Sequence, residues 1–484
     1  MRRAVAVVAT LLVASVTAVG YAALDVYDVV PGVLTLAHAP DPAPTQPVAA
    51  ATGTATTTVP QPQAATVGPP LATAGAQQPV PTTAGLQSAL QATLADPALA
   101  GRLGLTVRDA ATGTHLLDRD ADAPLIPASN LKLLAAAAVV SAFPAGATLT
   151  TKVVQGPTPG SLVLVAGGDT LLNPGAGDPG AVVGRAGLGD LVTRTADALR
   201  TAGVTGVTVS LDLSYAPGPL LASTWGSDFR PLGITGAVAA IGLGSQRVVP
   251  GKPGPADPTA AVAAAFVSGL QAKGVKAIRA PSSAQSAAPA GAAVLASVTS
   301  APVLDQLELA LVDSDDALTE ALTRQAAYVK GVAPGFAPTG GFVRDALAGL
   351  GVDVSGVSLV DASGLSRENQ VPTRVVADVI ALGLGDRFPA MRSVVGALAV
   401  GGLSGTLSDR FDDPSTRGAA GLFRGKTGTL TGVNALAGTI VTADGRLLVV
   451  DVIVNSTGAG AGTTAARAAL DRVVATLASC GCRT

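Results

Sequence analysis

The sequence predicts an α/β fold of the α+β kind, in which an antiparallel sheet is flanked by helices and an inserted, strand-rich second region interrupts it. Two strand-like segments joined by a turn occupy 104–118, and three more occupy 422–454. Helical patterns stand beside both groups. Between them, residues 148–291 alternate short strands with Gly- and Pro-rich loops. We interpret this middle stretch as one or two modules inserted into a single main domain.

Residues 1–24 have the pattern of an export signal. Arg2 and Arg3 precede an uncharged stretch that ends at Leu24. The stretch is also long enough to span a bilayer, so a cleaved signal and a retained N-terminal membrane anchor both fit. Either one places the rest of the protein outside the cytoplasm.

Residues 25–83 are predicted to be a linker. From His38 to Thr83 the chain is rich in Pro, Ala, Thr and Gln and carries almost no charge. This composition favours a semi-extended spacer over a packed domain. Such a spacer would hold a folded body away from a membrane.

The main domain is expected to begin near Ala84 and to comprise 84–147 and 292–484, on either side of the inserted region at 148–291. Asp444-Gly445 is a strong hairpin signal near its end. The patterns predict helices at 86–94, 190–201, 302–312, 317–329 and 464–477, a helix opening at Ser129, and strands at 104–109, 115–118, 148–154, 161–166, 207–213, 293–297, 357–361, 422–430, 434–442 and 446–454.

Composition excludes several classes of function. The formal net charge is -2, so no nucleic-acid partner is expected. The chain has only two histidines. His38 lies in the predicted linker, and His115 lies beside a predicted hairpin turn. If the chain performs acyl chemistry on a serine, its base is therefore not expected to be a histidine.

The two cysteines, Cys480 and Cys482, stand at the extreme C-terminus. A metal site would need more ligands than this pair supplies. In an oxidising compartment they are expected to pair locally or with another chain.

Ser129 and Lys132 form the first candidate catalytic pair. They stand three residues apart at the start of a predicted helix, so their side chains share one face. A serine hydroxyl is a poor nucleophile until a base takes its proton, and a buried lysine can serve as that base. The helix N-terminus favours negative charge on an attacked substrate. Alone, the pair is better explained as a helix cap followed by an ordinary exposed lysine.

A second candidate group, Lys426-Thr427-Gly428-Thr429, lies on the first of the three late strands. A lysine with two hydroxyl groups on a strand edge suits the binding of a carboxylate. Gly428 leaves room for the close approach of a substrate backbone.

Read in order, three motifs resemble the Ser-x-x-Lys, Ser-x-Asn and Lys-Thr-Gly signature of penicillin-binding proteins and serine β-lactamases. They begin here at Ser129, Ser314 and Lys426, and 185 residues separate the first two. This gap is larger than a compact β-lactamase needs. The chain from about 84 to 484 therefore resembles the insert-bearing D-alanyl-D-alanine carboxypeptidase/endopeptidase family of low-molecular-mass penicillin-binding proteins. The segment that starts at Asp361, Asp-Ala-Ser-Gly-Leu-Ser, is similar to one in that family.

The resemblance implies a serine β-lactamase/DD-peptidase-like domain that cuts the D-Ala-D-Ala bond of peptidoglycan stem peptides. Ser129 would form an acyl-enzyme with Lys132 as general base, and Ser314 would relay a proton to the leaving amine. Lys426 would hold the charge of that relay and, with Thr427 and Thr429, bind the terminal carboxylate of the substrate. The remaining substrate-binding residues would be Asp316 and Gly428, with the N–H groups of Ser129 and Thr429 as the oxyanion hole. β-Lactams would acylate Ser129 as inhibitors, and no metal or organic cofactor is needed.

The middle motif departs from the family pattern, because Asp316 stands where the family has asparagine. An ionised carboxylate cannot donate a hydrogen bond to a substrate, and close to Lys132 it would oppose loss of the lysine's proton. Slow turnover with retained binding is therefore an alternative, as in a wall-binding or scaffolding homologue. A β-lactamase is a third reading, against which the inserted region argues.

Overall fold

The computed structural model describes residues 77–249, 251–281, 287–385, 388–456 and 462–483. The predicted signal or anchor at 1–24 and nearly all of the linker lie outside these residues and stay predictions. None of the helices in the described residues combines the length and the apolar character needed to cross a bilayer. The described residues belong to one compact unit, 69–484.

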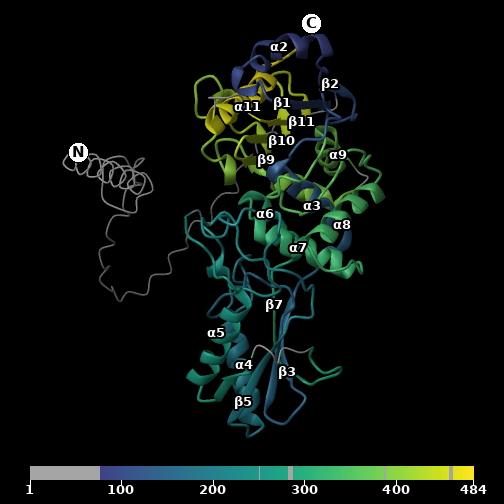
Figure 1. The fold of residues 1–484 in the computed structure, drawn as a ribbon. Helices are drawn as coiled ribbons and strands as arrows, with labels where there is room; N and C mark the ends of the chain where they lie inside the picture. The colour runs from purple at the N-terminus through teal and green to yellow at the C-terminus, as the bar shows by residue number, and fades with distance from the viewer. Residues whose placement is uncertain (1–76, 250, 282–286, 386–387, 457–461, 484) are drawn as a thin grey trace, which may run out of the picture. The chain divides into compact units, whose positions relative to one another are not determined.

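A six-stranded antiparallel sheet forms the centre of the main domain (Figure 1). The first strand of the folded part lies beside the last one, with Thr106 opposite Asp451. The first and last strands of the folded part are therefore neighbours in one sheet. Its strands, in spatial order, are β2 (His115–Arg119), β1 (Arg102–Asp109), β11 (Leu447–Asn455), β10 (Val433–Val441), β9 (Phe423–Leu430) and β8 (Ala399–Val400).

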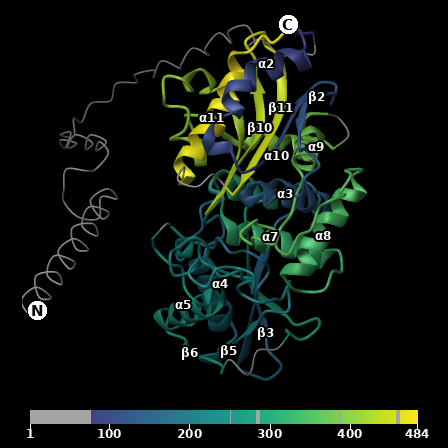
Figure 2. The ribbon, with the colours of Figure 1, turned by 45° about the horizontal axis from the view of Figure 1, so that its top comes forward.

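Helices cover both faces of this sheet. Alternate strand residues point to opposite faces, and accordingly Val449 packs in one apolar cluster and Val450 in the other. The cluster with Val450 contains α2 (Thr83–Leu94) and α11 (Gly462–Ser479), and Figure 2 shows α11 beside β10. The cluster with Val449 contains the helices α3 (Leu131–Ala142), α6 (Val303–Val312), α7 (Asp316–Val329), α8 (Phe336–Gly349), α9 (Thr373–Leu384) and α10 (Ala390–Ala397).

A second, five-stranded sheet occurs between α3 and α6. It has a separate apolar core, to which the helices α4 (Leu188–Thr201) and α5 (Pro258–Ala272) contribute. Two of its neighbouring strand pairs are parallel and two are antiparallel. Its order is β6 (Lys276–Arg279), β5 (Gly206–Asp212), β4 (Ser161–Val165), β3 (Thr150–Gln155) and β7 (Val294–Thr299).

The predicted fold class is confirmed: an antiparallel sheet is flanked by helices, and a strand-rich region interrupts it. One predicted strand, 357–361, is wrong. This segment is a loop with a single bridge between Ser358 and Gln370, because side-chain hydrogen bonds organise it instead of a sheet ladder. Of the described helices, α5, α8, α9 and α10 were not predicted.

Cys480 and Cys482 form a disulfide with each other, so the local pairing is the one found. The carbonyl oxygen of Cys482 accepts a hydrogen bond from Thr82 N at 2.8 Å. This bond ties the C-terminal segment to the start of α2.

Candidate active site

A cleft of about 1000 Å³ contains the predicted site. One wall comes from the main domain, and a second wall comes from the inserted region through Trp225, Phe229 and Ile234. Five of the predicted site residues line it: Ser129, Ser314, Asp316, Thr427 and Thr429. The two lysines lie behind this lining and reach it through hydrogen bonds.

Ser129 lies in a short 3-10 turn, Ala128–Asn130, and α3 begins only at Leu131. Ala128 has a positive φ of 46°, a conformation that packing must hold in place. Two glycines allow the backbone to approach this turn. A Cβ atom at Gly364 would lie 1.9 Å from Ala128 O, and one at Gly428 would lie 2.9 Å from Pro127 O. The turn that presents the serine is therefore clamped from two sides.

Side chains of the central strand β11 hold the same turn through hydrogen bonds. Asn455 accepts a hydrogen bond from Ile126 N at 2.7 Å and donates one to Ile126 O at 3.1 Å. Asn130 Nδ2 donates to Asp451 Oδ1 at 3.0 Å. Burial raises the pKa of Asp451 well above its usual range, although the hydrogen bond from Asn130 opposes this shift. The segment before α3 is thus fixed to the middle of the sheet.

Lys132 is fully buried, and its ammonium group donates three hydrogen bonds. The acceptors are Ser129 Oγ at 2.9 Å, Asp316 Oδ1 at 2.5 Å and Ser363 O at 2.8 Å. Burial raises the pKa of Asp316, while the charge of Lys132 opposes that shift. The predicted contact between the two motifs is therefore present, and Asp316 lies directly on the amine.

Ser314 lies between α6 and α7 with a positive φ of 56°. Its Oγ accepts a hydrogen bond from Lys426 Nζ at 2.8 Å, and the same amine donates to Thr427 O at 2.9 Å. Burial, and next the charge of Lys132, hold the pKa of Lys426 well below its usual range. The second and third motifs thus meet through a serine–lysine contact.

Strand β9 presents Thr427 and Thr429 to the cleft. The hydroxyl of Thr427 shares a hydrogen bond of 2.8 Å with that of Thr406. Gly428, between them, does not line the cleft, and a Cβ atom at this position would point to the turn that carries Ser129. The structure therefore explains this glycine by the protein's own packing, and not by the approach of a substrate backbone.

The loop at 361–366 is organised by the buried carboxylate of Asp361. It accepts hydrogen bonds from Gly364 N at 2.9 Å, Ser366 N at 2.7 Å and Asn369 Nδ2 at 2.7 Å. Trp225 of the inserted region adds a fourth, from Nε1 at 2.8 Å. Four donors on one carboxylate fix the loop, and this loop contains the Ser363 carbonyl that accepts from Lys132.

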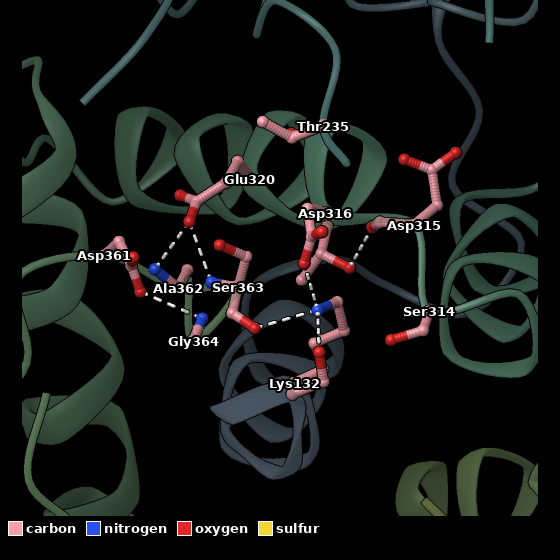
Figure 3. Close-up of polar contacts among 12 residues, drawn as sticks. Lys132, Thr235, Ser314, Asp315, Asp316, Glu320, Asp361, Ala362, Ser363 and Gly364 are labelled. Atoms are coloured by element: carbon pink, nitrogen blue, oxygen red, sulfur yellow. Dashed lines mark hydrogen bonds and ion pairs between the residues drawn. The ribbon is translucent and has the colours of Figure 1, made fainter. Parts of the chain in front are cut away.

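Glu320 lies one turn after Asp316 on α7 and contacts the backbone of the loop at 361–366 (Figure 3). Its Oε1 accepts hydrogen bonds from Ala362 N at 2.9 Å and from Ser363 N at 2.7 Å. Burial, and next the charge of Asp361, raise the pKa of Glu320 to about 8. Burial therefore favours the neutral form of this carboxyl group.

Arg247 of the inserted region holds both neighbours of Ser314. It donates from Nε to Asp315 at 2.9 Å and from Nη2 to Asp313 at 3.0 Å. Asp315 is also the N-cap of α7 and accepts from Leu318 N at 3.0 Å. The inserted region therefore helps to set the backbone at the second motif.

The structure brings the three motifs to one cleft, while His115 is exposed, pairs with Asp118 and does not line it. Sequence reasoning missed the supporting groups Glu320, Arg247 and Trp225. Trp225 is the only tryptophan in the sequence, and this rarity is the one feature that could have drawn attention to it.

The family model described as the D-Ala-D-Ala carboxypeptidase 3 (S13) family matches residues 86–255 and 228–477. The chain belongs to this family. The predicted family, that of the low-molecular-mass penicillin-binding carboxypeptidases, and the predicted enzyme class, a carboxypeptidase-type hydrolase, are therefore confirmed. This S13 peptidase carries the three motifs in the predicted order, with 185 residues between Ser129 and Ser314.

Two relatives of this S13 peptidase are named as carboxypeptidases. A protein named carboxypeptidase DacB from Mycolicibacterium smegmatis is 34% identical, over 87% of this chain and 90% of its own length. A carboxypeptidase of Mycobacterium tuberculosis is 33% identical, over 84% of this chain and 86% of its own length. Among solved structures, penicillin binding protein 4 of Haemophilus influenzae has a TM-score of 0.63 at 19% identity, over 80% of this chain and 97% of its own. This last likeness supports the fold.

Proposed function

We propose that this S13 peptidase is a serine-type D-Ala-D-Ala carboxypeptidase/endopeptidase that acts on peptidoglycan stem peptides through an acyl-enzyme on Ser129. One observation carries the proposal. Ser129 Oγ, on the cleft, lies 2.9 Å from the buried amine of Lys132. This is the distance needed for proton transfer from the nucleophile to its base.

Acylation would begin with Lys132 in its neutral form. The amine takes the proton of Ser129 Oγ while the oxygen attacks the carbonyl carbon of the penultimate D-Ala. The N–H groups of Ser129 and Thr429 would stabilise the oxyanion. The support is geometric: the turn with Ser129 packs against β9, on which Thr429 lines the same cleft.

Departure of the terminal D-Ala requires a proton on its nitrogen. Ser314 Oγ, 2.8 Å from Lys426 Nζ, is suited to deliver it. Lys426 would return a proton to Ser314, and the proton that Lys132 took from Ser129 would in turn recharge Lys426, so that both lysines regain their starting state. We assign the substrate carboxylate to Thr427 and Thr429, because both present hydroxyl groups to the cleft. Asp316, which also lines the cleft, would complete the substrate-binding edge. Water would then release the acyl group, and β-lactams would acylate the same serine.

A second candidate function is supported by the contact of 2.5 Å between Lys132 and Asp316. A carboxylate this close stabilises the protonated amine, which cannot accept a proton from Ser129. The chain would then bind wall peptides or hold other wall proteins while turning over slowly.

Release of D-alanine from a pentapeptide ending in D-Ala-D-Ala tests the proposal, with Ser129→Ala as control. We expect release by the wild type and none by the variant. Intact-mass spectrometry after penicillin treatment should show one adduct, on the peptide that contains Ser129. Absence of both signals would contradict the hydrolase, and an adduct without D-alanine release would favour the slow binder. Rapid loss of the adduct would instead indicate a β-lactamase.

We also propose that the protein acts outside the cytoplasm, on the cell-wall side. The support is the sequence pattern of residues 1–24 and the location of a peptidoglycan substrate. Fractionation of cells with an antibody against the folded body tests this location, because the cytoplasmic fraction should lack the protein.

A further inference from the structure

Glu320 is a buried acid that the proposed reaction does not use. It is 1% exposed and lies on α7, one helical turn from Asp316. A carboxyl group with no access to water is unfavourable unless its hydrogen bonds are satisfied. The partners that it finds are the backbone N–H groups of Ala362 and Ser363, at 2.9 and 2.7 Å.

Ser363 connects this acid to the amine of the site. Its N–H donates to Glu320, and its C=O accepts from Lys132 Nζ at 2.8 Å. Figure 3 shows the two contacts on opposite sides of the loop. Helix α7 therefore acts on Lys132 twice, directly through Asp316 and through the loop backbone by way of Glu320.

We propose that Glu320 is a positioning residue for Lys132 and acts through the backbone of residues 362–363. By accepting from both N–H groups it fixes the direction of the Ser363 carbonyl. That carbonyl aims the amine of Lys132 at Ser129 Oγ. The inference rests on the proposed role of Lys132 as the base of the reaction.

The charge of Glu320 adds a pH dependence to this arrangement. The charged groups around it are Asp361 on the loop, Arg324 and Asp316 on its own helix, and Lys132 across Ser363. Since its pKa is raised to about 8, Glu320 is neutral below that pH and gains a negative charge above it. The added charge repels Asp361 and so disturbs the loop whose Ser363 carbonyl aims the amine of Lys132. Acylation should therefore slow above pH 8, relative to a chain with a neutral group at 320.

Three variants of the full chain test the proposal. Glu320→Gln keeps an oxygen acceptor for both N–H groups and cannot ionise. Glu320→Leu removes the acceptor. Thr323→Val is the matched control, because Thr323 is also buried on α7 but bonds only within the helix, to Thr319 O at 2.7 Å. Saturation kinetics with a labelled penicillin separate the acylation rate constant from initial binding.

We expect Glu320→Leu to lower the acylation rate constant at least tenfold at pH 7 with initial binding changed less than threefold. Glu320→Gln should stay within about threefold of the wild type at pH 7 and exceed it above pH 8, and Thr323→Val should match the wild type throughout. A folded Glu320→Leu variant that acylates at the wild-type rate would overturn the inference. So would an equal loss in Thr323→Val, or a constant ratio between Glu320→Gln and wild type from pH 6 to 9.

The single tryptophan provides a readout that does not depend on catalysis. Trp225 donates to Asp361, on the loop that Glu320 holds. Its fluorescence should show a transition near pH 8 in the wild type that Glu320→Gln lacks. If the wild type forms no penicillin adduct, the proposed function fails, and this titration still decides whether Glu320 acts on the loop. Identical titrations would overturn that action.

Discussion

Replacement of Asp316 by asparagine should raise the rate of acylation. In the structure its carboxylate lies 2.5 Å from Lys132 Nζ, and both side chains are buried. A net hydrogen bond to a charged group is worth about 1.5–3 kcal/mol. Before Lys132 can accept a proton from Ser129 it must lose its own, and with it this stabilisation. Because about 1.4 kcal/mol corresponds to a factor of ten in rate, we expect Asp316→Asn to acylate roughly ten to a hundred times faster.

Asparagine at position 316 also keeps the hydrogen-bonding groups that the site needs. Its carbonyl oxygen can still accept from Lys132, and its amide can donate to a substrate, which a carboxylate cannot. The gain should therefore appear in the acylation rate constant.

The assay is stopped-time labelling with a fluorescent penicillin between pH 6 and 9. Asp197→Asn is the control, because it makes the same chemical change in an exposed ion pair with Arg200, on α4. We expect the control to behave as the wild type. If Asp316→Asn gives no gain anywhere in this range while remaining folded, the carboxylate is not a handicap. The contact would then represent a proton shared between Asp316 and Lys132.

Three further outcomes are expected. Arg247→Ala should lower the acylation rate about three- to tenfold, because Asp313 and Asp315 lose the guanidinium group that holds them beside the second motif. Arg247→Lys should restore part of the lost rate. Steady-state kinetics and melting curves measure both variants. Gly428→Ala should lower acylation at least tenfold, because the new Cβ would lie 2.9 Å from the backbone ahead of the nucleophile; a wild-type rate would contradict this. Asp451→Asn should raise the melting temperature at pH 8 more than at pH 4. Burial raises the pKa of Asp451 in the folded chain, so its protonated carboxyl group stabilises the fold fully only below the pKa that Asp451 has in the unfolded chain. This stabilisation is lost as the pH rises through the raised pKa of the folded chain.

The chemistry of the candidate site could be predicted from the sequence because its motifs are local. Ser129 and Lys132 are three residues apart, so any helical start brings them together. The same holds for Lys426 and its two threonines on one strand. Periodicity also predicted β9, β10 and β11, because each has the length and composition of a buried strand.

The groups that support the site could not be predicted in this way. Glu320 and Ser363 are 43 residues apart, and Arg247 and Asp315 are 68 apart. Nothing in the local pattern around an acid or an arginine says which distant backbone it will meet. The strand predicted at 357–361 was wrong for a related reason: Asn369 and Asp361, eight residues apart, close that segment into a loop.

By itself, the sequence determined which reactive groups the chain carries and in what order, and through them the family, because spacing along a helix or strand follows from covalent geometry alone. The tertiary structure alone decided how those groups are charged and aimed. It buries Lys132 against Asp316, sets Lys426 on Ser314, and joins β1 to β11 across the whole length of the folded part. Burial and distant pairing control these properties, and both arise only when segments far apart in the sequence pack together.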